Sequence, residues 1–412
     1  MTLQINTTAL SKELETLAQF SDAPAPAVTR IVFSERDAEA RAWLRQLYAA
    51  AHLEVCEDAI GNTFARWAGS EPNLPAVATG SHTDAIPHSG RYDGTVGVLG
   101  GLEAIRALQR SGFKPRRSIE LLMFTSEEPT RFGIGCLGSR LLSGTLAPAS
   151  AGALKDSEGR SVEDVRASAG FHGPLETVVL KHGCYSAFIE LHIEQGPLLE
   201  RRNVPIGIVT AIAAPASVSV TIEGQGGHAG AVLMPDRHDA FLAAAEIALA
   251  LEASACGTGF IDSVATTGIC EVFPGAVNSV PSRVRLAMDI RDTDLKRRDG
   301  MLADLDKACA EIAARRGVTV KNQLINRDAP ASCDPAIVAF LISSCEKNSL
   351  AYDTMVSRAY HDSLFMSRIC PTSMVFIPCH QGYSHRPDEY STPEAIGDGT
   401  LILAETLASL AD

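Results

Sequence analysis

The sequence is poor in positive charge and has no long apolar run. Its 412 residues include 36 Lys and Arg against 49 Asp and Glu, which gives a formal net charge of −13. Nucleic-acid-binding proteins use a net positive surface to attract phosphates, so this balance argues against that class. No apolar run reaches the ~20 residues that a membrane-spanning helix requires. We therefore expect neither nucleic acid nor a membrane among the partners.

The sequence also lacks closely paired cysteines and a recognisable secretory signal. Its ten cysteines contain no C-x-x-C pair, which argues against a zinc knuckle or a redox motif and favours reduced cysteines in the core. The first residues, Met1-Thr-Leu-Gln-Ile-Asn6, carry no basic segment followed by an apolar core. We therefore expect a cytoplasmic protein. At about 150 residues per domain, the length suggests two or three domains.

Two apolar segments run directly into charged and imidazole side chains. Residues 75–80 precede Ser81-His-Thr-Asp84, and residues 118–124 precede Thr125-Ser-Glu-Glu128. A helix-like stretch over 96–112 lies between them. Strand, helix and strand with nearly continuous apolar strands predict a buried parallel sheet, in which ligands bind beyond the carboxyl ends of the strands.

The pattern changes in the middle of the chain. An alternating strand at 217–222 begins an order β-α-β-β-α-β, which is typical of a small ferredoxin-like sandwich. Its other expected elements are an alanine-rich helix over 235–253, strands over 264–272, 284–290 and 318–325, and a second helix near 302–315.

An α/β pattern returns after this middle section. We therefore predict an α/β catalytic domain in two parts, residues 1–212 and 329–412, interrupted by a smaller α+β domain at 213–328. The small-residue-rich stretch 147–170 is expected to be a surface connection.

Several of the eleven histidines lie beside carboxylates. Imidazole and carboxylate ligands together suit zinc, manganese or related divalent ions better than calcium or magnesium. Two ions about 3.5–4 Å apart would need one shared carboxylate and four terminal ligands. Five groups match that number: His82, Asp93, Glu128, His192 and His385.

Spacing alone leaves a second interpretation open. A single histidine is more often a surface or hydrogen-bonded core residue than a ligand, and an acidic pair such as Glu127-Glu128 usually lies on a solvated face. The position of this pair after an apolar strand favours a site. Asp84, close behind His82, could then accept the other ring N–H of that histidine.

Six motifs resemble those of the M20 family of metal-dependent amidohydrolases and occur in the same order, over about residues 10 to 410. They are Gly80-Ser-His-Thr-Asp84, Asp93-Gly94, Thr125-Ser-Glu-Glu128, His192-Ile-Glu-Gln-Gly-Pro197, Gly226-Gly-His-Ala-Gly230 and Ser384-His-Arg-Pro387. The resemblance implies a di-metal, zinc-peptidase-like catalytic domain interrupted by a ferredoxin-like domain that serves as a lid and for homodimerisation. It also implies two divalent ions per subunit, with Mn²⁺ favoured and Zn²⁺, Co²⁺ or Ni²⁺ as alternatives.

The resemblance also implies roles for the residues of these motifs. One ion would be held by His82 and His192 and the other by Glu128 and His385, with Asp93 shared. Glu127 resembles the general base that takes a proton from the attacking water, a group that a poorly electrophilic ureido carbonyl requires. The catalytic group would also include Asp84, beside His82.

Further residues resemble substrate-binding or transition-state groups of the family. His228 resembles an imidazole contributed across the dimer to the developing oxyanion, although its glycine-flanked motif equally fits a surface turn. Five others resemble groups of the substrate pocket: Arg291, Asn278, Gln195, His361 and Tyr360. Arg291 suits a carboxylate through its planar guanidinium, but an ion pair with Asp292 or Asp294 is the alternative. Tyr360 would narrow the pocket, with plain packing as the alternative.

The segment His192-Ile-Glu-Gln-Gly-Pro197 resembles the branch of the family that cleaves carbamoyl and ureido groups. Pro129 and Arg358-Ala-Tyr-His-Asp362 depart from the patterns typical of members that act on carbamoyl amino acids or allantoate. Both departures favour a small ureido carboxylate, (S)-ureidoglycolate, cleaved to glyoxylate, ammonia and CO₂ in purine catabolism. The alternatives are N-carbamoyl-L-amino acids, N-carbamoyl-β-alanine and allantoate. A remote alternative is an inactive metal-binding dimeric homologue, which would be expected to lack a ligand or the base.

Overall fold

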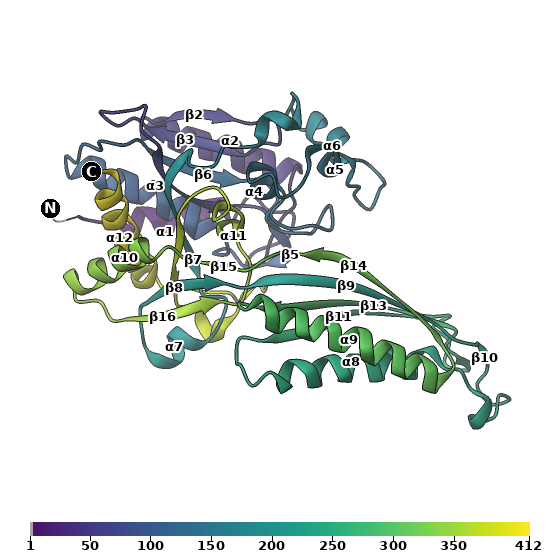
Figure 1. Ribbon diagram of the computed structural model, residues 1–412. Helices are drawn as coiled ribbons and strands as arrows, with labels where there is room; N and C mark the ends of the chain where they lie inside the picture. Colours follow the sequence, from purple (N-terminus) through teal and green to yellow (C-terminus); the bar gives the residue numbers. More distant parts are fainter. Residues whose placement is uncertain (1–2) are drawn as a thin grey trace. The chain divides into compact units, whose positions relative to one another are not determined.

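The computed structural model describes residues 3–412 and divides the chain into two compact units (Figure 1). Unit 1 comprises the chain up to Thr210 together with Ser332–Ser357 and His361–Asp412. Unit 2 comprises Ala211–Ala331 and Arg358–Tyr360. The sequence predicted divisions after residues 212 and 328, whereas the structure divides the chain after 210 and 331 and adds a three-residue segment to unit 2.

Unit 1 is built on one mixed sheet with the strand order β15-β8-β17-β7-β4-β6-β3-β2, and β16 pairs with β8. The four central strands β17, β7, β4 and β6 are parallel, and antiparallel strands flank them. The strands are β2 Glu54–Glu57, β3 Thr63–Trp67, β4 Ala76–His82, β6 Ile119–Phe124, β7 Tyr185–Ile193, β8 Ile206–Ile212, β15 Ala331–Ser332, β16 Tyr352–Ser357 and β17 Thr372–Ile377. A separate small ribbon pairs β1 Val28–Arg30 with β5 Ala85–Ser89.

Helices cover both faces of this sheet, because its strands are apolar on both sides. Along β6, Leu121 and Met123 belong to one core cluster, while Leu122 and Phe124 belong to the other, as the two-residue repeat of a strand requires. The first cluster takes in α1 Thr7–Leu17, α2 Glu35–Ala50, α3 Thr95–Arg110, α10 Pro335–Lys347 and α12 Pro393–Ala411. The second takes in α4 Leu137–Leu142, α5 Pro148–Ala153, α6 Val162–Ser168 and α11 Asp362–Met366. Short elements complete the unit: α7 Leu198–Arg202 and the 3₁₀ turns Leu175–Val178 and His380–Gly382.

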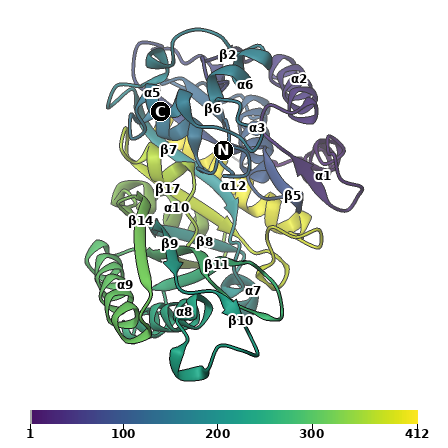
Figure 2. The same ribbon diagram turned by 90° about the vertical axis from the view of Figure 1, so that its right-hand side faces the viewer.

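Unit 2 is a four-stranded antiparallel sheet with two helices packed on it. Its elements follow the order β9-α8-β11-β13-α9-β14, and the strands lie in the order β11-β13-β9-β14. The two helices lie side by side on the sheet, as both views show (Figures 1 and 2). The bounds are β9 Ala214–Glu223, α8 Ala240–Gly257, β11 Val264–Phe273, β13 Arg283–Asp292, α9 Leu295–Arg316 and β14 Thr319–Arg327. A two-residue ribbon pairs β10 Gly227–His228 with β12 Ser279–Val280, and Met234–Asp236 forms a 3₁₀ turn.

Two local expectations need correction. The helix expected from residue 235 begins at Ala240, because the Asp239 side chain accepts the backbone N–H groups of Phe241 and Leu242 and so caps the helix there. The stretch 147–170, expected to be a surface connection, contains α5 and α6. The second of these helices begins with a capping box between Ser161 and Asp164.

The helix α8 is the one described helix with the length and composition of a membrane span. Its 18 residues have a mean hydropathy of 1.5, and 33% of that window is buried. Its buried side chains, among them Ala244, Ile247 and Leu251, pack into the core of unit 2. A core helix passes the same test of length and composition, so this feature is weak evidence for a membrane.

Candidate metal and active site

Three of the expected ligands lie where parallel strands of unit 1 end. His82 is the last residue of β4, His192 is next to last in β7, and Glu128 follows shortly after β6. Parallel strands place their carboxyl ends at one edge of the sheet, which brings these side chains together. Asp93 enters from the turn before α3. That turn needs Gly94, which has a φ of +66° and would overlap the His82 ring if it carried a Cβ.

Asp93 lies between two groups of side chains. Its Oδ1 is 3.4 Å from Nε2 of His82 and 3.3 Å from Nε2 of His192. Its Oδ2 is 3.5 Å from Nε2 of His385, which lies 3.2 Å from Oε1 of Glu128. Ligand atoms at about 2.1 Å from a tetrahedral ion are about 3.4 Å apart. Each group therefore has the donor types and the spacing to hold one cation, with Asp93 shared between the two.

Backbone carbonyls orient the two buried imidazoles. Nδ1 of His82 is 3.0 Å from the carbonyl oxygen of Asp84, and Nδ1 of His192 is 2.9 Å from that of Ile193. A ring that donates from Nδ1 presents the lone pair of Nε2 to the cluster, as a metal ligand must. The structure thus brings the five predicted ligands together in an arrangement suited to coordination.

The carboxylate of Asp84 makes different contacts from those expected. Its Oδ1 is 3.7 Å from Nδ1 of His82, which is longer than the contact of that ring with the Asp84 carbonyl. The two carboxylate oxygens accept the backbone N–H groups of Glu127 and Glu128, at 3.2 and 3.1 Å. Asp84 therefore orders the acidic pair through its side chain and meets the His82 ring through its backbone.

Burial and pairing between imidazoles and carboxylates dominate the electrostatics of the cluster. Burial raises the pKa of Glu127 well above its ordinary value, against the opposing charge of His82, and it raises the pKa of Asp84 to about 6. At Asp93, burial alone would raise the pKa, but hydrogen bonds from the His192 and His82 rings in their doubly protonated, cationic form outweigh it and hold the pKa well below its usual range. The hydrogen bond to Glu128 raises the pKa of His385 to about 9. This concentration of carboxylates favours cations.

Glu127 stands beside the cluster without belonging to either ligand group. Its Oε2 is 3.7 Å from Nε2 of His82, and its Oε1 accepts a weak hydrogen bond from the Cys136 thiol at 3.3 Å. The backbone N–H of Cys136 also donates to the carbonyl of Glu127, at 2.7 Å. Ser126, just before it, has a φ of +58°, a strained conformation that is common at functional sites. A carboxylate held in this way is suited to proton transfer.

Gln195 and His361, both expected in the substrate pocket, differ in their surroundings. Gln195 has a φ of +54°, donates to Oδ2 of Asp93, and has a buried Oε1 without a hydrogen-bond partner among the described residues. An unsatisfied buried amide oxygen at such a place fits a ligand-binding group. His361 is buried with its ring centroid 4.4 Å from that of His192 and its Nε2 3.1 Å from Oγ of Ser357.

A third group of potential ligands, formed by Glu190, His192 and His361, is engaged in other contacts. Glu190 accepts hydrogen bonds from the hydroxyls of Ser81 and Ser363, at 2.7 and 2.6 Å. Both oxygens of Glu190 are therefore engaged in hydrogen bonds with serine hydroxyls, which argues against a further cation site.

The ribbon β10–β12 in unit 2 brings together two of the predicted residues. His228 pairs with Ser279, and the carbonyl of Asn278 accepts the backbone N–H of Ala229. His228 is exposed, and its Nδ1 accepts the backbone N–H of Gly230 at 3.1 Å. In the neutral ring the proton is therefore on Nε2, which makes His228 a hydrogen-bond donor at an exposed edge.

Arg291 also lies in unit 2, where it is paired with a different carboxylate from those expected. Its Nε is 2.5 Å from Oδ1 of Asp289, whereas Asp292 pairs with Arg297. The guanidinium of Arg291 lies 5.2 Å from the ring centroid of Tyr360, within the range of a cation–π interaction. The structure thus places Arg291 and Tyr360 side by side.

Glu389, which no sequence motif singled out, is a buried carboxylate that contacts two of the site's loops. Its Oε1 accepts the backbone N–H groups of Tyr92 and Asp93, and its Oε2 lies 2.9 Å from the hydroxyl of Ser384. Burial raises the pKa of Glu389 to about 7. Its position in the sequence, four residues after His385, was the one available signal.

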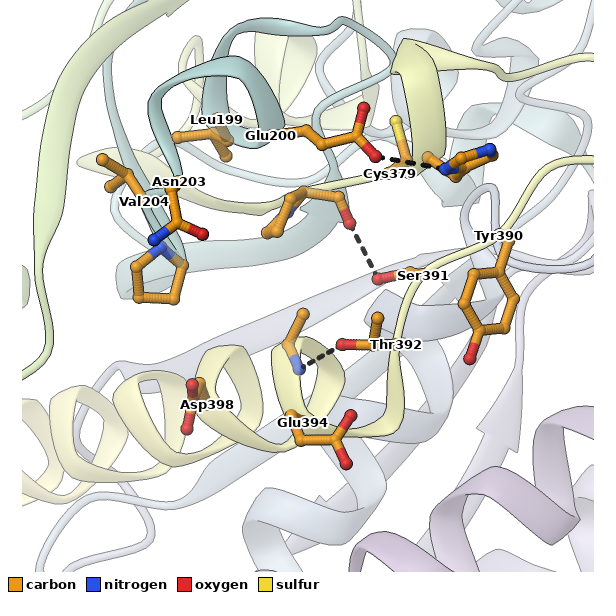
Figure 3. Close-up of a pocket in the computed structure, with 14 residues that line it drawn as sticks. Leu199, Glu200, Asn203, Val204, Cys379, Tyr390, Ser391, Thr392, Glu394 and Asp398 are labelled. Atoms are coloured by element: carbon orange, nitrogen blue, oxygen red, sulfur yellow. Dashed lines mark hydrogen bonds and ion pairs between the residues drawn. The ribbon is translucent and has the colours of Figure 1, made fainter.

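A cavity of about 400 Å³ lies elsewhere in unit 1 (Figure 3). It is bordered by α7, by the segments 378–380 and 390–392, and by the first turns of α12, where Glu394 and Asp398 are found. None of the five expected ligands lines this cavity. The site is therefore defined by the converging imidazoles and carboxylates rather than by this cavity.

Comparisons with known proteins show the family of this chain. Residues 78–409 match the model of Peptidase family M20/M25/M40. The ureidoglycolate hydrolase of Arabidopsis thaliana is 52% identical, over 99% of this chain and 87% of that protein. An N-carbamoyl-L-amino acid amidohydrolase of Geobacillus stearothermophilus is 35% identical, over 98% of both chains. A crystal structure of AtUAH in complex with glyoxylate has a TM-score of 0.92 at 51% identity and covers 99% of this chain and 98% of that one.

The chain belongs to Peptidase family M20/M25/M40 and is a hydrolase, which confirms the family and the enzyme class expected from its motifs. Its mixed α/β fold is also that of the family's solved structures.

Proposed function

We propose that the protein is a two-ion amidohydrolase that cleaves the ureido group of (S)-ureidoglycolate. The observation that carries this proposal is the position of Asp93, whose two oxygens face two separate groups of imidazole and carboxylate ligands. The substrate follows from the 52% identity to a ureidoglycolate hydrolase, against 35% to the carbamoyl-amino-acid enzyme. The five proposed metal ligands and the proposed base, Glu127, are all present, which argues against an inactive homologue.

Two divalent ions per subunit would be held by His82 and His192 on one side and Glu128 and His385 on the other, with Asp93 shared. Mn²⁺ is the ion we propose, and Zn²⁺, Co²⁺ and Ni²⁺ suit the same ligands. When bound, such ions polarise a carbonyl and lower the pKa of water.

The side chains of the protein supply the proton transfers. Glu127 takes a proton from the attacking water and passes it to the nitrogen that leaves, while Asp84 holds the Glu127-Glu128 segment in place. His228, with its proton on Nε2, donates a hydrogen bond to the oxygen that becomes negative.

The products follow from the atoms of the substrate. Water adds to the ureido carbonyl, and the bond from this carbon to the nitrogen on the glycolate carbon breaks as that nitrogen takes up a proton, which releases carbamate and hydroxyglycine. Carbamate decomposes to CO₂ and ammonia, and hydroxyglycine to glyoxylate and a second ammonia. We place this reaction in purine-derived nitrogen salvage in the cytoplasm.

Steady-state assays with Mn²⁺ test the choice of substrate. We expect kcat/KM for (S)-ureidoglycolate to exceed that for N-carbamoyl-L-amino acids, N-carbamoyl-β-alanine and allantoate by at least about 100-fold, because specificity of this size needs only about 2.7 kcal/mol of differential binding. Equal or faster turnover of any of the other three would assign the protein to that substrate instead.

We propose that Arg291 binds the carboxylate of the substrate, with Asn278 and Gln195 as further contacts and with His361 and Tyr360 shaping the pocket. The variant Arg291→Ala is expected to raise KM about 10- to 100-fold, because a charge-assisted pair contributes about 1.5–3 kcal/mol. The matched control is Arg297→Ala, whose side chain is equally exposed (26% against 25%) and pairs with Asp292. A KM that rises equally in both variants would remove Arg291 from the binding site.

Unit 2 is proposed to act as a ferredoxin-like lid and dimerisation domain. Its β-α-β-β-α-β order and the exposed imidazole of His228 support this role. Sedimentation equilibrium at micromolar concentration should give the mass of a homodimer, and a monomer mass would contradict the proposed contribution of His228 to a partner's site.

A further inference from the structure

The side chain of Glu389 joins two loops that are far apart in the sequence. One loop contains Tyr92 and Asp93, whose backbone N–H groups donate to Oε1 of Glu389 at 2.7 and 3.1 Å across almost 300 residues. The other loop contains Ser384 and His385. Glu389 is only 4% exposed, so its carboxylate is largely shielded from water. Without the carboxylate, the buried N–H of Asp93 and the partly buried N–H of Tyr92 would lose their acceptor, which is energetically unfavourable.

Ser384 links the carboxylate of Glu389 to the carboxylate of Asp93, the ligand proposed to be shared by both ions. Its hydroxyl lies 2.5 Å from Oδ2 of Asp93 and 2.9 Å from Oε2 of Glu389. A hydroxyl has one proton, so Ser384 can donate to only one of these oxygens at a time. Glu389 therefore contacts Asp93 by two routes, directly at the backbone and through Ser384 at the oxygen that faces His385.

Gly90 makes room for this arrangement. A Cβ at Gly90 would overlap Cβ, Cδ and Oε1 of Glu389. Because these are the atoms nearest the loop, any larger residue at position 90 must displace either the carboxylate or the turn that carries Asp93. The position of the Glu389 side chain therefore depends on glycine at position 90.

We propose that Glu389 is a positioning residue that fixes Asp93 relative to His385 and thereby sets the affinity of the protein for the second of its two ions. This inference rests on the two-ion site proposed above. Carboxylates that hydrogen-bond to metal ligands typically change metal affinity about 10- to 100-fold when they are removed. Glu389 hydrogen-bonds to the Asp93 backbone and to Ser384, so its effect is exerted through these two residues.

Calorimetric titration of the metal-free, full-length protein with Mn²⁺ tests this role without substrate. Glu389→Ala is expected to weaken binding of one ion about 10-fold or more and to leave the other nearly unchanged. Glu389→Gln is expected to restore affinity to within about threefold, because the amide oxygen can accept both backbone N–H groups and the amide nitrogen can donate to Ser384. Gly90→Ala, which displaces Glu389 without altering it, should reproduce the alanine variant.

The matched control is Glu103→Ala, which removes another buried carboxylate that accepts a distant backbone N–H, that of Asn6. Its Mn²⁺ isotherm should equal that of the wild type, and thermal unfolding of each metal-free variant verifies folding. Two ions bound by Glu389→Ala with wild-type affinities would overturn the inference and leave the proposed function intact. The inference would also be overturned if Glu389→Ala weakened the binding of both ions equally, or if Glu389→Gln failed to restore the affinity. A wild-type protein that binds fewer than two ions would instead refute the two-ion site itself.

Discussion

Replacing Glu127 by glutamine is expected to lower kcat about 10³-fold while Mn²⁺ content stays at the wild-type level. An amide cannot take a proton from water, and a positioned general base contributes about 10²–10⁴ to the rate. Glu127 lies outside both ligand groups, so its replacement leaves the coordinating atoms in place. The measurement is kcat for (S)-ureidoglycolate together with metal analysis of the dialysed protein.

Glu120→Gln is the matched control for this variant. Glu120 lies in β6, just upstream of the acidic pair, is as buried as Glu127 (8% exposed each), and accepts a hydrogen bond from the Tyr185 hydroxyl. Its kcat should stay within about twofold of the wild type, because it contacts no member of the cluster. Near wild-type turnover by Glu127→Gln with full metal content would show that Glu127 is not the base.

The variant Asp93→Ala is expected to have a larger effect than Glu127→Gln. It should lose both ions, and its kcat/KM should fall by more than about 10⁴-fold. Both carboxylate oxygens face ligand groups, so the substitution removes one ligand from each ion at once. His82→Ala removes a ligand from one group only and should weaken one ion preferentially. Mn²⁺ stoichiometry after dialysis distinguishes the two results.

Asp58→Ala provides the control for the loss of a loop carboxylate. Asp58 accepts the backbone N–H groups of Ile60 and Asn62 but belongs to none of the potential ligand groups. The Asp58→Ala variant should have a free energy of unfolding lower by about 1–3 kcal/mol and should keep its metal. If Asp93→Ala still binds two ions tightly, Asp93 is not the shared ligand.

Much of the site was predictable because its residues follow local patterns. His82 and the Glu127-Glu128 pair come directly after apolar strands, and the carboxyl ends of parallel strands meet at one edge of a sheet. The approach of His385 to the second oxygen of Asp93 was not predictable, because His385 enters from a loop almost 300 residues further along the chain.

Other features depended on single hydrogen bonds that no periodic pattern indicates. The carboxylate of Asp84 holds two backbone amides rather than the His82 ring, and Arg291 pairs with Asp289 rather than with its later neighbours. The start of α8 was missed because its cap, Asp239, follows a 3₁₀ turn that resembles helix in sequence.

The sequence by itself determined the family, the hydrolase class, the alternation of strands and helices, and the residue types that could bind cations, because these depend on composition, short motifs and the repeat of apolar positions. Only the tertiary structure decided which oxygen of Asp93 faces which imidazole, which ring nitrogen each histidine presents, and that Glu389 joins the loops of Asp93 and His385. The physical reason is that these contacts have ångström tolerances and join segments whose separation is set by the whole path of the backbone.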